Sequence, residues 1–254
     1  MSKIRISTIS YLNTLPFLYG LNNSEYINDN CIIESDIPSA CAEKLLKKQT
    51  DIGIVPVAII PQLTQSKIIS DYCIGATQSV KTVILLSNVP LNQIKNIYLD
   101  YQSRTSIELV KILAKYKWNI NPTWIPASSG YEDNIKEETA GIIIGDRAFA
   151  AAKKYLYVYD LASEWIDFTG KPFVFACWVT TDNLQPEFIE NFNTALKYGI
   201  DNILLFSQKY AILYAKHQVD LEKYFTENIS YQLNKNKIEG MNLFFKYQKM
   251  IVNQ

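Results

Sequence analysis

Apolar and polar positions alternate from Lys3 to Ile9, and this alternation predicts a β-strand. The segment Ser10–Phe17, with the sequence Ser-Tyr-Leu-Asn-Thr-Leu-Pro-Phe, follows directly and leads into a predicted helical turn at residues 17–20. In an open α/β sheet, ligands usually bind at the carboxyl ends of strands. Asn13 and its neighbours would then line a site. The alternative is that Asn13 only forms the turn, since asparagine often bonds to its own backbone.

Strand and helix patterns continue to alternate after this turn. Residues 31–36 form a predicted strand, and a predicted helix opens at Pro38 and extends to about Lys48. The nearly continuous apolar run at residues 51–57 is typical of a strand that is buried on both faces.

A second series of the same kind begins with a predicted strand at residues 96–100 and a predicted helix from about Ser106 to Lys117. Thr105 and Glu108 have the spacing of a capping box at its start. After Pro186 the spacing is helical almost to the end. The later predicted helices cover residues 188–200, 206–217, 220–233 and 238–251.

Two strand-helix blocks closed by helices indicate an α/β fold rather than an α+β fold. They predict two lobes, of which the first is discontinuous. Its two parts are residues 1–89 and 179–254, and the second lobe is residues 90–178. Ligands favour the interface between such lobes, so the interlobe cleft is the expected site.

Composition excludes several classes of protein. The 254 residues are 48% hydrophobic and 20% charged, and 25 basic residues balance 25 acidic ones, so no basic field predicts nucleic-acid binding. No run reaches the roughly 18 apolar residues of a membrane helix. Met1–Arg5 does not begin a secretion signal, so we expect a cytoplasmic protein.

Few residues are available for metal or cofactor chemistry. His217 is the single histidine, which speaks against a zinc site or a Ser-His-Asp triad, and it is expected on the surface. Neither GxGxxG nor GxxxxGK[ST] occurs, so we expect no nucleotide cofactor and no metal. Four scattered cysteines are predicted to be buried free thiols (Cys31, Cys41, Cys73 and Cys177).

Three polar turns besides Asn13 are candidates for chemistry. The segment Ser103–Ser106 lies at a strand-to-helix junction, where it is suited either to bind an anion or only to cap the helix. Gln78–Thr82 precedes an apolar strand and either reaches the cleft or forms a solvated loop. Asp146 either caps the helix after residues 142–144 or places a carboxylate in the site. Trp165 and Trp178 are expected to pack in the core.

The chain resembles chorismate dehydratase of the futalosine route to menaquinone, a family with a type II periplasmic-binding-protein-like fold. The resemblance covers about residues 4–180. It rests on Ile9–Phe17, Asp51–Val57, Asp100, Ser103–Ser106, Ile144–Asp146, Glu164–Trp165 and Thr169–Trp178. One departure is Thr82, where the family has serine; the hydroxyl is retained, with an added methyl group.

This resemblance implies that chorismate loses water to give 3-[(1-carboxyvinyl)oxy]benzoate, without a cofactor. It implies that Asn13, Thr82 and Asp146 are catalytic, with either Asp146 or the substrate's own enolpyruvyl carboxylate as the base. The implied substrate-binding residues are Ser10, Tyr11, Ser103, Arg104, Thr105 and Ser106.

Two alternatives remain. One is a non-catalytic protein that binds small anions with the same fold, since fold does not imply function. The other is the related 1,4-dihydroxy-6-naphthoate synthase.

Overall fold

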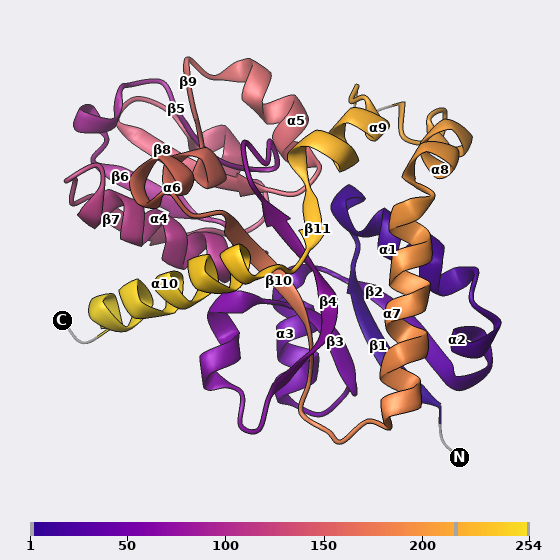
Figure 1. Cartoon of the computed structure of the whole chain (residues 1–254). Helices are drawn as coiled ribbons and strands as arrows, with labels where there is room; N and C mark the ends of the chain where they lie inside the picture. The colour runs from indigo at the N-terminus through magenta and orange to yellow at the C-terminus, as the bar shows by residue number, and fades with distance from the viewer. Residues whose placement is uncertain (1–2, 216–217, 253–254) are drawn as a thin grey trace.

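The computed structural model describes residues 3–215 and 218–252, which form two β-sheets covered by helices (Figure 1). The first sheet has the strand order β11-β4-β10-β3-β1-β2, and the second has the order β7-β6-β8-β5-β9. The strands of the first sheet are β1 (Ile4–Ile9), β2 (Cys31–Asp36), β3 (Ile52–Pro56), β4 (Lys67–Ala76), β10 (Phe173–Thr180) and β11 (Ser230–Gln232). Those of the second are β5 (Val83–Ser87), β6 (Asn96–Leu99), β7 (Thr123–Pro126), β8 (Thr139–Ile144) and β9 (Tyr157–Asp160).

Helices follow most of the strands, which confirms the predicted α/β class. The α-helices are α1 (Leu15–Asn22), α2 (Glu25–Asn30), α3 (Pro38–Leu46), α4 (Thr105–Tyr116), α5 (Arg147–Ala151), α6 (Leu161–Thr169), α7 (Pro186–Asp201), α8 (Ile203–Tyr210), α9 (Leu221–Lys223) and α10 (Lys235–Val252). The 3-10 helices are η1 (Leu12–Thr14), η2 (Val57–Gln62), η3 (Leu91–Gln93), η4 (Tyr131–Asn134) and η5 (Ala152–Lys154), and η7 (Tyr224–Asn228) is a π-helix.

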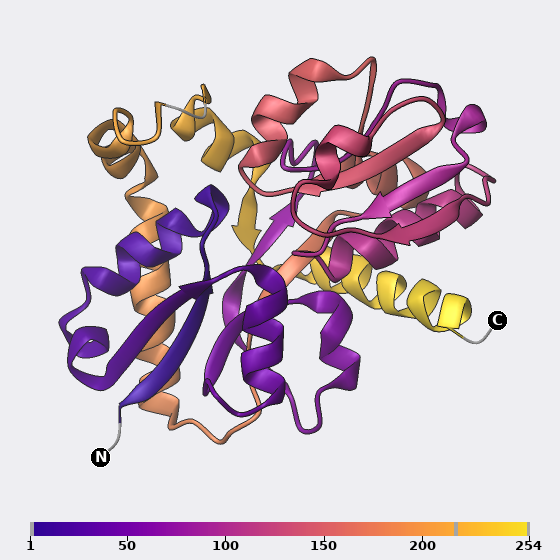
Figure 2. The ribbon, with the colours of Figure 1, turned by 180° about the vertical axis from the view of Figure 1, so that it is seen from behind.

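The centre of each sheet is apolar. β3, β5 and β10 are buried along their whole length, as their continuous apolar sequences predict. β1 runs parallel to β2 and β3, whereas β10 lies antiparallel between β3 and β4. α10 packs along α4 and β10, and so joins the two halves of the molecule (Figure 2).

The chain changes from one sheet to the other between β4 and β5, and returns between α6 and β10. These points precede the division that we predicted at residues 89 and 178. β5 belongs to the second sheet because it pairs with β8 and β9, and β10 belongs to the first because it pairs with β3 and β4. Below, each sheet with its helices is called the first or the second lobe.

Close contact between α1 and α7 fixes the turn that follows β1. A Cβ atom on Gly199 would lie 1.8 Å from the carbonyl oxygen of Pro16, and one on Gly20 would lie 2.0 Å from that of Ala195. Only glycine allows the two backbones to approach this closely. The start of α1, and therefore the preceding η1 turn, is held firmly against the first lobe.

The helix predicted at residues 220–233 is wrong over most of its length. The segment forms the short α9, the π-helix η7 and the strand β11, which pairs with β4. That pairing joins positions far apart in the sequence, so local spacing did not indicate it. The helix predicted at residues 206–217 ends at Tyr210 as part of α8, and His217 lies outside the described residues.

Other predictions about the core are confirmed. All four cysteines are buried and free, and Trp165 and Trp178 are both fully buried. Trp178 makes edge contacts with Phe17 and Phe192, at ring centroid distances of 5.7 and 5.0 Å. Within residues 3–215 and 218–252, no helix combines the length and apolar character needed to cross a membrane.

Candidate functional site

A cavity lies between the two sheets, at the carboxyl ends of several strands. Ile9, Pro56 and Ile144 are the last residues of β1, β3 and β8, and all three line it. Six of the nine predicted site residues also contribute to the lining: Tyr11, Asn13, Thr82, Ser103, Thr105 and Ser106. The remaining lining residues are Pro38, Ile74, Val80, Val83, Gly145, Phe175 and Ala176.

The turn after β1 supplies Tyr11 and Asn13 to one wall. The hydroxyl of Thr14 donates to the carbonyl oxygens of Ile9 and Tyr11, which closes this turn. The side-chain Oδ1 of Asn13 is buried and has no hydrogen-bond partner among the described residues. An unpaired buried carbonyl is costly, so the turn holds an acceptor ready for a donor that enters the cavity. Ser10 is exposed and does not line the cavity.

The amino-terminal end of α4 forms the facing wall. The hydroxyl of Ser103 accepts a hydrogen bond from the backbone N–H of Ser106 at 3.0 Å, which caps the helix. The predicted capping box does not form. The hydroxyl of Thr105 instead donates to the carbonyl of Phe175 at 3.1 Å and accepts from the N–H of Ala58 at 3.3 Å. Thr105 therefore fastens the start of α4 to the first lobe.

Arg104 points away from this cavity. It is exposed and lines a different surface hollow together with Glu43 and Glu108. The helical geometry explains the difference, because successive residues at a helix start point in different directions. The prediction, implied by the resemblance, that Arg104 binds the substrate is therefore not supported by its position.

Thr82 lies at the crossing from the first lobe to the second and is almost completely buried. Its Oγ1 lies 2.9 Å from the hydroxyl of Tyr224 and 3.3 Å from the carbonyl oxygen of Val80. The loop before it is held by Asp160, whose carboxylate accepts from the hydroxyl of Ser79 at 2.8 Å and from the N–H of Lys81 at 2.7 Å.

Asp146 joins the two lobes rather than lining the cavity. Its Oδ1 accepts a hydrogen bond from the backbone N–H of Leu12 at 3.0 Å, and its side chain does not cap α5. The predicted capping role is therefore wrong. Next to it, Gly145 has a φ of +73°, and a Cβ atom there would lie 2.7 Å from the ring of Tyr11. The Tyr11 ring thus packs directly on this backbone.

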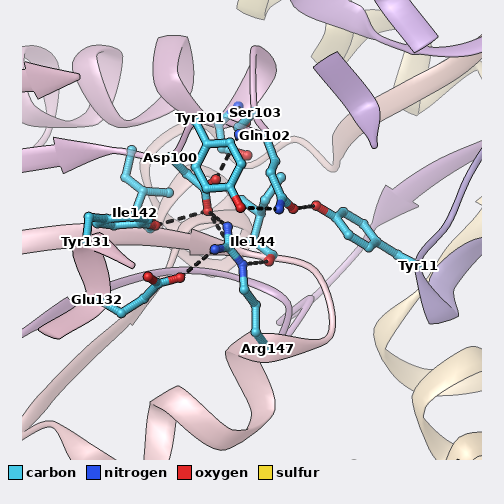
Figure 3. A network of polar contacts seen from close by, with 11 residues as sticks. Tyr11, Asp100, Tyr101, Gln102, Ser103, Tyr131, Glu132, Ile142, Ile144 and Arg147 are labelled. Carbon is cyan, nitrogen blue, oxygen red and sulfur yellow. Dashed lines mark hydrogen bonds and ion pairs between the residues drawn. The ribbon is translucent and has the colours of Figure 1, made fainter. Parts of the chain in front are cut away.

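A buried ionic network supports the turn that carries Ser103 (Figure 3). The carboxylate of Asp100 is fully buried and accepts from the N–H groups of Gln102 and Ile144, at 2.9 and 3.1 Å. It also contacts the hydroxyl of Tyr131 at 3.0 Å and pairs with the guanidinium of Arg147. Burial raises the pKa of the Asp100 carboxyl, and the charge of Arg147 limits that rise.

The network reaches the other lobe through Gln102, whose side-chain oxygen accepts from the hydroxyl of Tyr11 (Figure 3). Burial, followed by the charge of Asp100, raises the pKa of Tyr11, so its hydroxyl stays protonated. Sequence reasoning noted Asp100 only through the family resemblance and missed Tyr131 and Arg147. Their roles depend on contacts between distant segments, which no local motif indicates.

The cavity is lined mostly by apolar side chains and carries no fixed charge. No lysine, arginine, histidine, aspartate or glutamate belongs to the described lining. Across the part of the chain that the structure describes, no cluster of three histidine, cysteine or acidic residues is suited to hold a metal ion. The arrangement offers hydroxyls, an amide and the start of a helix, which together suit an anionic organic ligand.

Comparison with solved structures identifies the fold. The structure is similar to protein AF1704 from Archaeoglobus fulgidus, with a TM-score of 0.78 and 12% identity over 99% of this chain and 98% of that one. It is also similar to the Candida albicans CA3427 gene product, described as having the generic periplasmic binding protein fold (TM-score 0.70, 13% identity, 98% and 91% covered). A third similar structure is the alkanesulfonate-binding protein SsuA from Xanthomonas axonopodis pv. citri (TM-score 0.67, 14% identity, 98% and 94% covered). The predicted periplasmic-binding-protein-like fold is confirmed.

Comparison with protein families gives a match over almost the whole chain. A family model described as menaquinone biosynthesis matches residues 4–250.

Proposed function

The chain belongs to the menaquinone biosynthesis family, and we propose that it is a chorismate dehydratase, a lyase that converts chorismate to 3-[(1-carboxyvinyl)oxy]benzoate and water. One observation carries the proposal. Asn13, Thr82 and Ser103, which come from three separate turns, line a single cavity at the start of α4. The family resemblance attributes site roles to the same residues.

The substrate would enter as a dianion. The first N–H groups of α4 have no acceptor inside the helix, and the helix dipole favours negative charge at this end. We propose that the hydroxyls of Ser103 and Ser106, together with those first N–H groups that Ser103 does not already cap, bind one carboxylate. Asn13 and Thr82 would hydrogen-bond the ring substituents from the opposite wall. Thr105 would contribute by holding the helix start in place, because its hydroxyl already bonds Phe175 and Ala58.

The reaction would proceed by stepwise elimination. A base removes the ring proton at C3, and the electron pair spreads through the conjugated C1–C2 double bond into the ring carboxylate. Expulsion of the C4 hydroxyl, which leaves as water after it takes up the proton that the base removed, then forms the third ring double bond and yields an aromatic product. Fixed donors at the developing charge are what such a step requires, because they need no reorganisation during the reaction.

We propose that the base is the enolpyruvyl carboxylate of the substrate itself. It is bonded close to C3, whereas the described lining has no aspartate, glutamate or histidine. Asp146, the other candidate, already accepts a hydrogen bond from the backbone of Leu12. The protein would then act mainly by positioning the dianion so that its own carboxylate reaches the C3 proton.

The test is to incubate the purified protein with chorismate and follow both the ultraviolet spectrum and the product mass. Loss of one water with formation of an aromatic spectrum is the expected result. Binding of chorismate without turnover would favour the non-catalytic anion-binding protein. If chorismate is neither bound nor consumed, the dehydratase assignment fails, and the related naphthoate synthase becomes the reaction to test.

A further inference from the structure

Tyr224 is a buried tyrosine that contacts Thr82, one of the proposed catalytic residues, without lining the cavity itself. It begins the π-helix η7 and is 1% exposed. Its ring packs edge-on against Phe149, with a centroid distance of 5.1 Å, and lies 5.4 Å from that of Phe225. Its hydroxyl lies 2.9 Å from Oγ1 of Thr82, which lines the cavity.

The hydrogen bonds of Tyr224 and Thr82 determine the direction of their two hydroxyl protons. Within the described residues, Thr82 is the sole hydrogen-bond partner of the Tyr224 hydroxyl. A buried hydroxyl needs an acceptor for its proton, so Tyr224 donates to Thr82. The proton of Thr82 then has two directions available: the carbonyl of Val80, at a long 3.3 Å, or a substrate oxygen in the cavity.

The same carboxyl-terminal segment is anchored to the two turns that carry Thr82 and Asn13. The side-chain amide of Asn228 donates to the carbonyl of Ser79 at 2.9 Å, in the loop that leads to Thr82. The hydroxyl of Tyr231 donates to the backbone carbonyl of Asn13 at 3.0 Å. A π-helix is a rare irregularity that is often found at functional sites, and here it aims Tyr224 at Thr82.

We propose that Tyr224 is a positioning residue for the dehydration: by donating to Thr82, it turns the threonine proton toward the oxygen atoms of the bound substrate. This inference rests on the proposed function. Burial raises the pKa of Tyr224, so it stays a donor over the pH range of an assay. Threonine at position 82 then acts as a donor of fixed direction rather than as a freely rotating hydroxyl.

The test is a double-mutant cycle between Tyr224→Phe and Thr82→Val, with kcat and KM for chorismate as readouts. Tyr224→Phe keeps the ring packing and removes only the hydroxyl, and it should lower kcat by about tenfold, with KM changed by less than about twofold. Adding Tyr224→Phe to the Thr82→Ser variant should lower kcat by the same factor, because serine keeps a hydroxyl that Tyr224 positions. In Thr82→Val the added Tyr224→Phe change should cost less than about twofold, because the group that it positions is gone.

Tyr155→Phe is the matched control. It removes a tyrosine hydroxyl that bonds the carbonyl of Glu132 at 2.9 Å, outside the cavity lining, and should leave kcat and KM unchanged. An equal loss from Tyr224→Phe with and without the Thr82 hydroxyl would overturn the inference, and so would an unchanged kcat. Absence of dehydration by the unmodified chain would instead overturn the proposed function, and with it the role of Tyr224.

Discussion

Removal of the Asn13 side chain should lower activity without lowering stability. Its Oδ1 is buried and unpaired among the described residues, so the amide contributes no hydrogen bond there to offset its desolvation. In the proposed complex it meets a donor on the substrate. Asn13→Ala therefore removes an interaction that forms only when ligand binds.

The expected magnitudes follow from the cost of an unsatisfied polar group. Leaving a buried acceptor unpaired costs about 1–3 kcal/mol, and truncation of Asn13 removes this cost while giving up some packing. The free energy of unfolding should thus stay within about 1 kcal/mol of the parent value or rise by up to about 2 kcal/mol. Loss of one hydrogen bond in the transition state should lower kcat/KM by about 5- to 150-fold.

Asn193→Ala is the matched control, with the opposite expected result. The side chain of Asn193 accepts from the hydroxyl of Ser70 at 2.8 Å and from the N–H of Asp71 at 3.1 Å, and donates to two backbone carbonyls. It does not line the cavity. Asn193→Ala should lower the free energy of unfolding by about 1–3 kcal/mol or more and leave kcat/KM unchanged.

Urea denaturation and steady-state kinetics with chorismate measure both quantities on the same preparations. If Asn13→Ala loses stability and activity together, as a simple packing residue would, the assignment of a site role to its side chain is wrong. Unchanged kinetics would refute it as well.

Three further predictions follow from the geometry of the site and of the first strand. Asp146→Asn should keep kcat within about threefold of the parent value, because the amide oxygen still accepts the hydrogen bond from the backbone and the substrate supplies the base. A loss of kcat by more than about 100-fold at an unchanged melting temperature would instead identify Asp146 as the base. Gly145→Ala should raise KM and cost about 1 kcal/mol or more, because φ is +73° and the new Cβ would lie 2.7 Å from the ring of Tyr11; wild-type values in urea denaturation and kinetics would contradict this. Asp51→Asn should lower the urea midpoint near neutral pH, because its hydrogen bond with Arg5 holds the pKa of the Asp51 carboxyl below its ordinary value. That stabilisation is present above the unfolded-state pKa of about 4 and is lost as the pH falls through the pKa of Asp51 in the folded protein. The difference in urea midpoint between the parent and Asp51→Asn should therefore shrink in acid. A difference that stays constant with pH would show that the ion pair with Arg5 does not cause it.

Much of the fold was predictable because its elements are recorded in local patterns. The alternation at the amino terminus gives β1, and the apolar run at residues 51–57 gives the buried strand β3. Strand pairing was less predictable. β9 was missed and β11 was taken for part of a helix, because short edge strands owe their conformation to the neighbour with which they pair.

The candidate site was predictable in part for the same reason. Polar turns at strand ends identified Asn13, Thr82 and Ser103 as candidates, and these residues do line one cavity. The direction of each side chain was not predictable. Arg104, which follows Ser103 directly, faces outward, and the carboxylate of Asp146 turns to the backbone of the other lobe.

The sequence alone determined the α/β class, the polar turns at strand ends and the family motif, because each depends on residues that are close together along the chain. Only the tertiary structure decided which turns meet and which groups stand behind them. Thr82 and Tyr224 are separated by 142 positions, and Leu12 and Asp146 by 134. Such contacts depend on strand order and on the angle between the lobes, which the burial of the whole core determines and no local pattern of residues specifies.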